Sequence, residues 1–107
     1  MSAIATHDLN RLQQLYAAGF QDAFIDNALR KIIDHQIARN EADLQRVNIE
    51  LAQFEQRYRW TSEDFYTRYQ SGQIDDTADF MEWNVFCKMR LRITSRLSIL
   101  RSENNHA

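Results

Sequence analysis

The sequence predicts an all-α protein in which a long heptad-patterned helix and a C-terminal helix form an antiparallel helical hairpin, within a dimer. The chain has 107 residues with no proline and two glycines, against about five prolines and seven glycines in an average chain of that length. No segment alternates apolar and polar residues with the period of two that strands show. Apolar residues recur instead at intervals of three and four, which is the period of a helix.

The length favours one domain, and we expect residues 1–107 to form a single helical domain of four helices. The first helix is predicted over residues 7–18. Thr6 or Asp8 can cap its start, and Gly19 stands where a glycine commonly follows the last helical residue.

The second helix is predicted over residues 23–59, a stretch with neither glycine nor proline. A helix of that length measures roughly 55 Å, so it needs an antiparallel partner helix, a second subunit or both. Its apolar residues occupy a and d positions if Asn40 is counted, and Asn40 would fix the register of two copies at a cost in stability. We predict a homodimer whose seam consists of Ile33, Ile37, Asn40, Leu44, Val47, Leu51 and Phe54.

A short third helix is predicted over residues 62–71. Thr61 and Asp64 have the spacing of a capping box, and Trp60 and Phe65 occupy the positions of a hydrophobic staple on either side of it. The short helix would therefore start directly after the long one and join it to the last helix.

The last helix is predicted over residues 76–102, with Asp76 or Thr77 as its cap. Acidic residues lie at its start and arginines towards its end, an order that the helix dipole favours. The basic half could also contact an acidic protein or a phosphate backbone. Most aromatic residues lie between Phe54 and Phe86. They either form a plug at the end of the hairpin or remain exposed in part as anchors for a partner.

The composition argues against several classes of protein. A net charge of −2 gives no global electrostatic reason to bind nucleic acid or an anionic membrane. The single cysteine, Cys87, excludes an intramolecular disulfide and suits a reducing compartment. No run approaches the roughly 18 apolar residues of a membrane span, and the first residues lack the features of a signal peptide. We therefore expect a cytoplasmic protein that does not enter a membrane.

No motif names a catalytic chemistry, and we predict no enzyme, no cofactor and no metal. Residues 75–79 spell the D-D-x-x-D pattern of isoprenoid synthases, but those enzymes need a larger helical barrel and a second acidic motif. Asp76, Asp79 and Glu82 share one helix face, which leaves a weak divalent-cation site as an alternative to plain compensation of the helix dipole. Cys87 lacks a partner histidine, and we expect it to be a small buried hydrophobic residue.

Binding of nucleic acid is unfavourable through residues 62–92. A helix-turn-helix built from them would direct Asp76, Asp79 and Glu82 at a polyanion, which is the wrong sign of charge. Contact with DNA through the basic C-terminal helix stays open.

Residues 54–83 carry a resemblance to a known family. The run F-E-Q-R-Y-R-W-T-S-E-D-F-Y, followed by Tyr69, Gly72, Asp76 and the ending D-F-M-E-W, resembles small helical prokaryotic proteins that read F-E-x-K-Y-G-M-S-S-E-E-F-Y and end in D-x-x-D-F-F-E-W. Many of these proteins are encoded beside predicted ribonuclease-like toxins of the TumE type and are taken for their antitoxins. This chain has Arg59 and Asp75 where the pattern has glycine, and Arg59 predicts a continuous or differently turned helix end.

The resemblance implies a non-enzymatic, antitoxin-like protein-binding module that neutralises a ribonuclease-like toxin by occlusion. The predicted partner-binding face consists of Phe65, Tyr69, Asp76, Asp79, Glu82 and Trp83. Aromatic anchors combined with carboxylates would complement the basic cleft of a nuclease. The alternative is a structural or adaptor coiled-coil homodimer with an unrelated protein partner.

Overall fold

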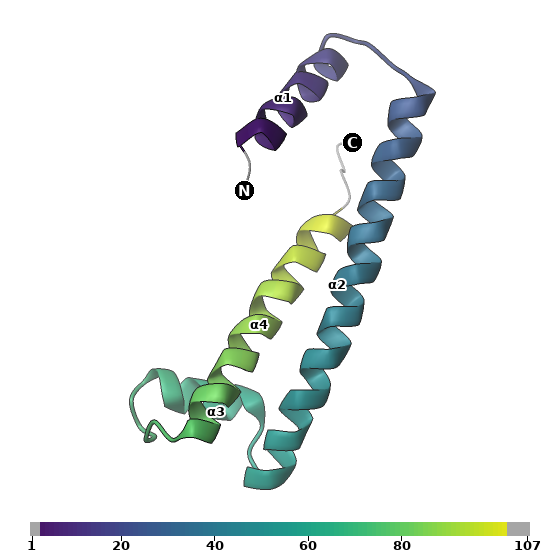
Figure 1. Ribbon diagram of the computed structural model, residues 1–107. Helices are drawn as coiled ribbons and strands as arrows, with labels where there is room; N and C mark the ends of the chain where they lie inside the picture. Colours follow the sequence, from purple (N-terminus) through teal and green to yellow (C-terminus); the bar gives the residue numbers. More distant parts are fainter. Residues whose placement is uncertain (1–2, 103–107) are drawn as a thin grey trace. The chain divides into compact units, whose positions relative to one another are not determined.

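A computed structural model describes residues 3–102, and these residues form four helices joined by short links. Figure 1 labels the helices as α1 (Ala3–Ala17), α2 (Ala23–Tyr58), α3 (Ser62–Gln70) and α4 (Ala78–Arg101). The predicted fold class, an all-α protein with a helical hairpin, is confirmed. None of the helices in residues 3–102 combines the length and the apolar character needed to traverse a bilayer.

The chain divides into two compact units, residues 1–32 and residues 33–107, and the division falls within α2. The first unit holds α1 and the first turns of α2. Within it, the Tyr16 hydroxyl donates a hydrogen bond to the Asp26 carboxylate at 2.7 Å, and the Tyr16 ring meets Phe20 edge-on. Helix α2 runs without interruption through both units. The prediction of a single domain stays a prediction.

Two helices begin at other residues than the sequence predicted. Helix α1 starts at Ala3, so Thr6 and Asp8 lie within it and do not cap it. Alanine has the highest helix propensity, and Ala3 and Ala5 extend the helix towards the N-terminus. Helix α4 starts at Ala78 rather than at 76, because Thr77 has an extended backbone and its side chain accepts the amide hydrogen of Phe80.

The short helix begins with the cap that the sequence predicted. The Thr61 hydroxyl accepts a hydrogen bond from the Asp64 amide at 3.1 Å, and α3 begins at Ser62. The helix ends at Gln70, with Ser71 as its C-terminal cap.

The end of α2 differs from the prediction for Arg59. The helix stops at Tyr58, and Arg59 has a φ angle of 62°. The helix is therefore not continuous through residue 59, and Arg59 has a left-handed backbone that glycine also adopts readily. The left-handed backbone allows α3 to start directly afterwards. This conformation costs a residue with a Cβ atom about 1–2 kcal/mol.

Replacing Arg59 with glycine should stabilise the protein by about 0.5–1 kcal/mol, because glycine adopts a positive φ angle without steric strain and this gain exceeds the greater chain entropy that glycine loses on folding. The midpoint of urea unfolding should rise. Arg59→Ala is the matched control, since alanine also removes the long side chain but keeps the Cβ atom, and it should give no gain. A glycine variant that unfolds at or below the wild-type midpoint would contradict the assigned strain.

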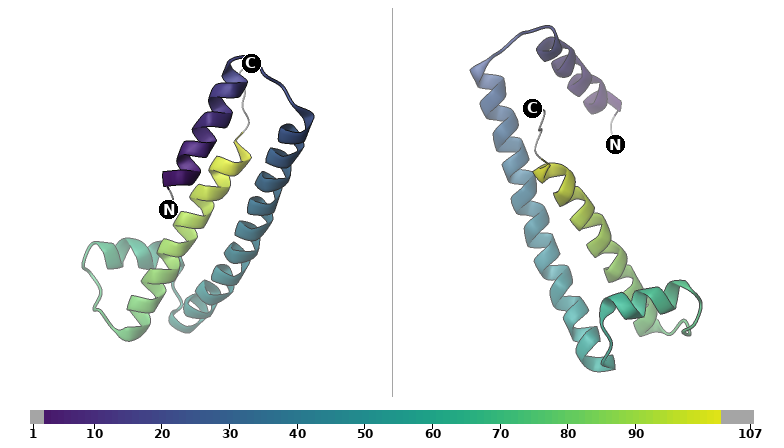
Figure 2. Two further views of the ribbon diagram at one scale, coloured as in Figure 1. Left: turned by 45° about the horizontal axis from the view of Figure 1, so that its top comes forward. Right: turned by 180° about the vertical axis from the view of Figure 1, so that it is seen from behind.

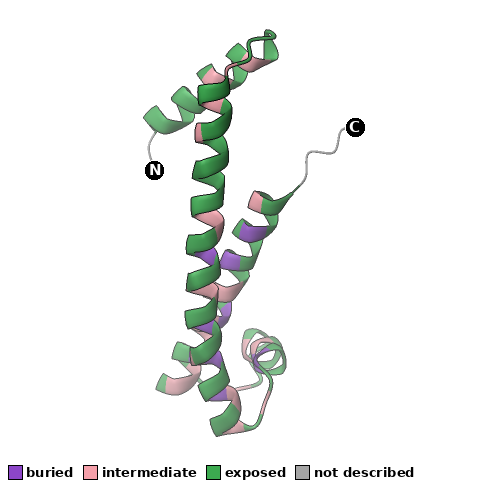
Figure 3. Ribbon diagram, turned by 90° about the vertical axis from the view of Figure 1, so that its right-hand side faces the viewer, coloured by how far each residue is buried: buried purple, intermediate pink, exposed green. Residues whose placement is uncertain are grey.

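In residues 33–102, α2 and α4 run antiparallel, and α3 lies at the closed end of the hairpin (Figure 2). Contacts along the pair define the register. Glu41 forms an ion pair with Arg101, Arg90 reaches Asn48 at 3.4 Å, and the Tyr58 hydroxyl donates to Asp79. Figure 3 shows that buried positions lie on the sides of α2 and α4 that face each other. The buried core consists of Val47, Leu51, Phe54, Phe65, Trp83, Cys87, Ile93 and Leu97.

Candidate protein-binding surface

The aromatic residues at the closed end form an intramolecular stack centred on Trp83. Its ring lies between Phe54 of α2 and Phe65 of α3, with centroid distances of 5.5 and 4.0 Å and nearly parallel planes. The indole nitrogen donates a hydrogen bond to the Ser62 hydroxyl at 2.9 Å. Phe65, Trp83 and Ser62 are all 0% exposed.

This stack corrects the predicted partner-binding face for two residues. Neither Phe65 nor Trp83 offers any surface to a partner in the folded chain. The physical reason is that α3 places the Phe65 ring directly on Trp83, so the aromatic residues act as the plug of the hairpin. Tyr69 remains partly exposed and stacks on the outer side of Phe65 at 5.3 Å.

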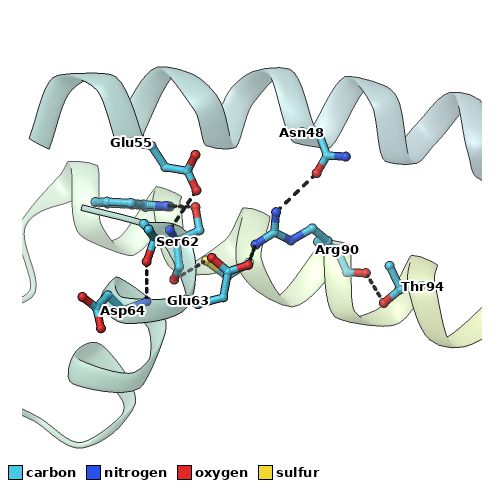
Figure 4. Close-up of polar contacts among 10 residues, drawn as sticks. Asn48, Glu55, Ser62, Glu63, Asp64, Arg90 and Thr94 are labelled. Atoms are coloured by element: carbon cyan, nitrogen blue, oxygen red, sulfur yellow. Dashed lines mark hydrogen bonds and ion pairs between the residues drawn. The ribbon is translucent and has the colours of Figure 1, made fainter. Parts of the chain in front are cut away.

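Polar contacts around Ser62 hold α3 against both long helices (Figure 4). The Ser62 amide donates to the Glu55 carboxylate of α2 at 2.8 Å. Arg90 of α4 forms an ion pair with Glu63 of α3 at 3.0 Å and also contacts Asn48 of α2. The position of α3 is therefore set by contacts to both α2 and α4.

Cys87 is buried beside this network, as expected of a small hydrophobic residue. Its sulfur lies 3.9 Å from the Ser62 carbonyl oxygen. Burial raises the pKa of the thiol to about 11, so at neutral pH it is protonated. A protonated and enclosed thiol is a poor nucleophile, which gives Cys87 a packing role.

Two of the predicted carboxylates fasten the start of α4 to the rest of the hairpin. Asp79 accepts hydrogen bonds from the Tyr58 hydroxyl and, at 2.8 Å, from the Arg57 guanidinium. The hydrogen bond from Tyr58 and then that from Arg57 hold the pKa of Asp79 below its ordinary value. Asp76 accepts the Tyr69 hydroxyl hydrogen at 2.6 Å. The ion pair with Arg57 offsets the negative charge of Asp79, whereas Asp76 accepts a hydrogen bond from a neutral hydroxyl and keeps its charge.

The lowered pKa of Asp79 makes part of the stability depend on pH. A carboxyl whose pKa is lower in the folded state stabilises the fold above its unfolded pKa, near 3.9, and loses that contribution as the pH falls through its folded pKa. Wild type should therefore unfold at higher urea than Asp79→Asn at pH 7, and the two midpoints should converge as the pH falls below the lowered pKa of Asp79, since protonated aspartate resembles asparagine.

Glu82→Gln is the control for this titration. Glu82 lies on the same helix and takes part in no ion pair within residues 3–102, so its replacement should leave the urea midpoints nearly unchanged across the pH range. A difference between wild type and Asp79→Asn that stays constant from pH 7 to pH 2 would show that the Tyr58–Arg57–Asp79 contacts do not depend on the charge.

The predicted dimer seam is largely filled from within one chain. Four of its residues, Asn40, Val47, Leu51 and Phe54, are buried, Ile37 and Leu44 pack against the core, and Ile33 is exposed. Asn40 donates to the Gln36 carbonyl oxygen of its own helix at 2.8 Å. The heptad pattern therefore reflects packing against the chain's own α4, and Asn40 is not placed to pair with a second copy.

The start of α4 presents a surface that includes the predicted Asp76 and Glu82 together with residues that the sequence did not single out. Met81 and Val85, one turn apart, are each 53% exposed, and Glu82 beside them is exposed. Asp75 and Asp76 are exposed in the preceding link. The helical period could have predicted that Met81 and Val85 are exposed, because they lie opposite the buried stripe of α4. We call this group, Asp75, Asp76, Met81, Glu82 and Val85, the closed-end surface.

Residues 3–32 have an unusually apolar exterior. None of the described residues in this unit is buried. Large apolar side chains are exposed instead, namely Ile4, Leu9, Leu15, Phe20, Phe24, Leu29 and Ile32. This unit therefore buries no hydrophobic core of its own.

The cations of α4 fall into two groups. Arg90 and Arg101 form ion pairs with carboxylates of α3 and α2. Lys88, Arg92 and Arg96 are exposed and, within the described part of the chain, take part in no ion pair. Contact between this basic half and a nucleic acid stays a prediction.

Within residues 3–102, no group of three or more histidine, cysteine, aspartate or glutamate side chains is placed to hold a metal ion. Comparison with known proteins gives no match to a family model, to a curated protein or to a solved structure.

Proposed function

We propose that the chain is a non-enzymatic, antitoxin-like protein-binding module that neutralises a ribonuclease-like toxin by covering its substrate cleft. The closed-end surface carries this proposal. Met81 and Val85 offer apolar contact area on α4, Glu82 of the same helix is exposed, and Asp75 and Asp76 are exposed in the link before it. A surface of this kind suits a protein partner with an apolar patch and positive charge.

The expected partner is positively charged for a chemical reason. A ribonuclease holds a phosphate backbone, and phosphate binding depends on lysine and arginine side chains. The exposed carboxylates of Asp75 and Glu82 can pair with such cations. Neutralisation would then be steric and electrostatic, with no covalent step. The resemblance of residues 54–83 to antitoxin-like proteins supports this choice of partner, and we propose that it operates in the cytoplasm.

The proposal predicts that a basic, ribonuclease-like protein is encoded beside this chain, and the test is binding to that protein, measured by calorimetry at two salt concentrations. Glu82→Lys should weaken binding about tenfold or more and reduce its salt dependence, because it places a cation opposite a cationic cleft. Asp79 is left unchanged, since its loss would disturb the fold. Asp34→Lys makes the same change of charge at an exposed site of α2 and should bind like wild type. Equal binding by wild type and Glu82→Lys would exclude the closed-end surface.

One observation favours a second candidate, a structural or adaptor homodimer with an unrelated protein partner. The exposed apolar side chains of residues 3–32 need a covering surface. Purification of the chain from its native host, followed by mass spectrometry, separates the candidates. An antitoxin would bring the neighbouring basic protein with it, whereas an adaptor would bring a protein encoded elsewhere.

A further inference from the structure

A groove of about 500 Å³ lies between α2 and α4. Its floor is apolar and consists of Val47 from α2 and Phe86, Met89 and Ile93 from α4. Val47 and Ile93 are buried, whereas Phe86 and Met89 are only partly covered. Two helices alone leave one side of their packed interface open, and the groove is such an opening.

The two rims of the groove differ in charge. Asp43, Arg46 and Glu50 lie on the α2 rim, which has one more carboxylate than cations, and Arg92 and Arg96 lie on the α4 rim, which is basic. Within residues 3–102 no ion pair joins the rims, because Asp43 contacts Arg46 of its own helix and the other three are unpaired. In the antiparallel register of the hairpin, Asp43 lies near the height of Arg96, and Glu50 lies within about one turn of Arg92.

We infer that this groove binds a second copy of the chain. A two-fold axis parallel to the hairpin places α2 against α4 of the partner and leaves the heights of all residues unchanged. Asp43 then faces the partner subunit's Arg96, and Glu50 faces the partner subunit's Arg92. The same patch serves both copies, as a two-fold interface requires, and the apolar floors close together as in a four-helix bundle.

This dimer differs from the one that the heptad pattern predicted. The buried residues of the heptad seam stay inside each hairpin, and the contact is made by the neighbouring groove instead. The inference is independent of the proposed function, because none of the closed-end surface residues lines the groove.

The test measures the mass of the full chain by light scattering and follows dissociation by analytical ultracentrifugation. Wild type should be a dimer. Arg92→Glu/Arg96→Glu should raise the dimer dissociation constant about a hundredfold or more. In each of the two contacts between α2 of one copy and α4 of the other, the altered α4 rim would then repel the carboxylates of the α2 rim. Lys88→Glu, at an exposed site of α4 outside the groove, should remain a dimer. Circular dichroism checks that each variant is helical.

A second variant, Asp43→Arg/Glu50→Arg, provides the decisive result. Alone it should be a monomer, because basic rims would meet. Mixed with Arg92→Glu/Arg96→Glu, it should form a heterodimer, because every rim then meets one of opposite charge. Wild type that is monomeric at all concentrations would overturn the inference even if a variant fails to fold. Dimers that survive either reversal, or a mixture that forms no heterodimer, would overturn it as well.

Discussion

Replacing Trp83 with alanine should lower the free energy of unfolding by about 3–5 kcal/mol. The ring is fully buried and stacks between Phe54 and Phe65, so its removal leaves a cavity bounded by both of those rings. The Ser62 hydroxyl, also buried, loses its hydrogen-bond donor, which adds to the loss. Small domains have only about 5–15 kcal/mol of stability in total, so this one change should remove much of it.

Urea unfolding followed by circular dichroism measures the effect. Trp83→Phe should fall between wild type and Trp83→Ala, because it keeps an aromatic ring in the stack and loses the hydrogen bond to Ser62. Met81→Ala, on the exposed face of the same helix, should change stability by about 0.5 kcal/mol or less. A loss below about 1 kcal/mol for Trp83→Ala would show that the ring is not the plug of the hairpin, given the usual cost of such a cavity.

Replacing Leu51 with arginine should unfold the hairpin. Leu51 is 1% exposed at the centre of the interface between α2 and α4. No carboxylate belongs to the buried core around it, so the guanidinium would be an unpaired buried charge. Such a charge is among the few changes that cost more than about 4 kcal/mol. The circular dichroism spectrum at 25 °C should lose most of its helical signal.

Ile49→Arg is the matched control for Leu51→Arg. It makes the same kind of substitution two residues away on the same helix, but Ile49 is 54% exposed. The arginine can remain in water there, and the melting temperature should change little. If both variants unfold, or both stay folded, then the face of α2 that the structure turns towards α4 is wrongly assigned.

The two proposed surfaces can be used together. The closed-end surface and the groove share no residue, so a dimer formed through the groove would keep two copies of the closed-end surface exposed. The charge reversals proposed for one surface should therefore leave binding at the other unchanged, since independent sites give additive effects.

The local signals of the sequence predicted much of the fold. The lack of proline, the helical period and the capping residue Thr61 each act within a few neighbouring residues, so they predict helices and the start of α3 without knowledge of the tertiary structure. The heptad pattern also predicted which face of α2 is buried. It could not predict the left-handed backbone at Arg59, because nothing in that residue type favours a positive φ angle.

What covers each face was decided by the tertiary structure. The same apolar stripe on α2 suits a second copy or the chain's own α4, and only the observed register shows that α4 covers Val47, Leu51 and Phe54. Asp79 looked free in the sequence because its partners, Arg57 and Tyr58, are more than twenty residues away. Helical periodicity states which residues share a face. It does not state which distant residue meets that face, because that depends on how complete helices pack.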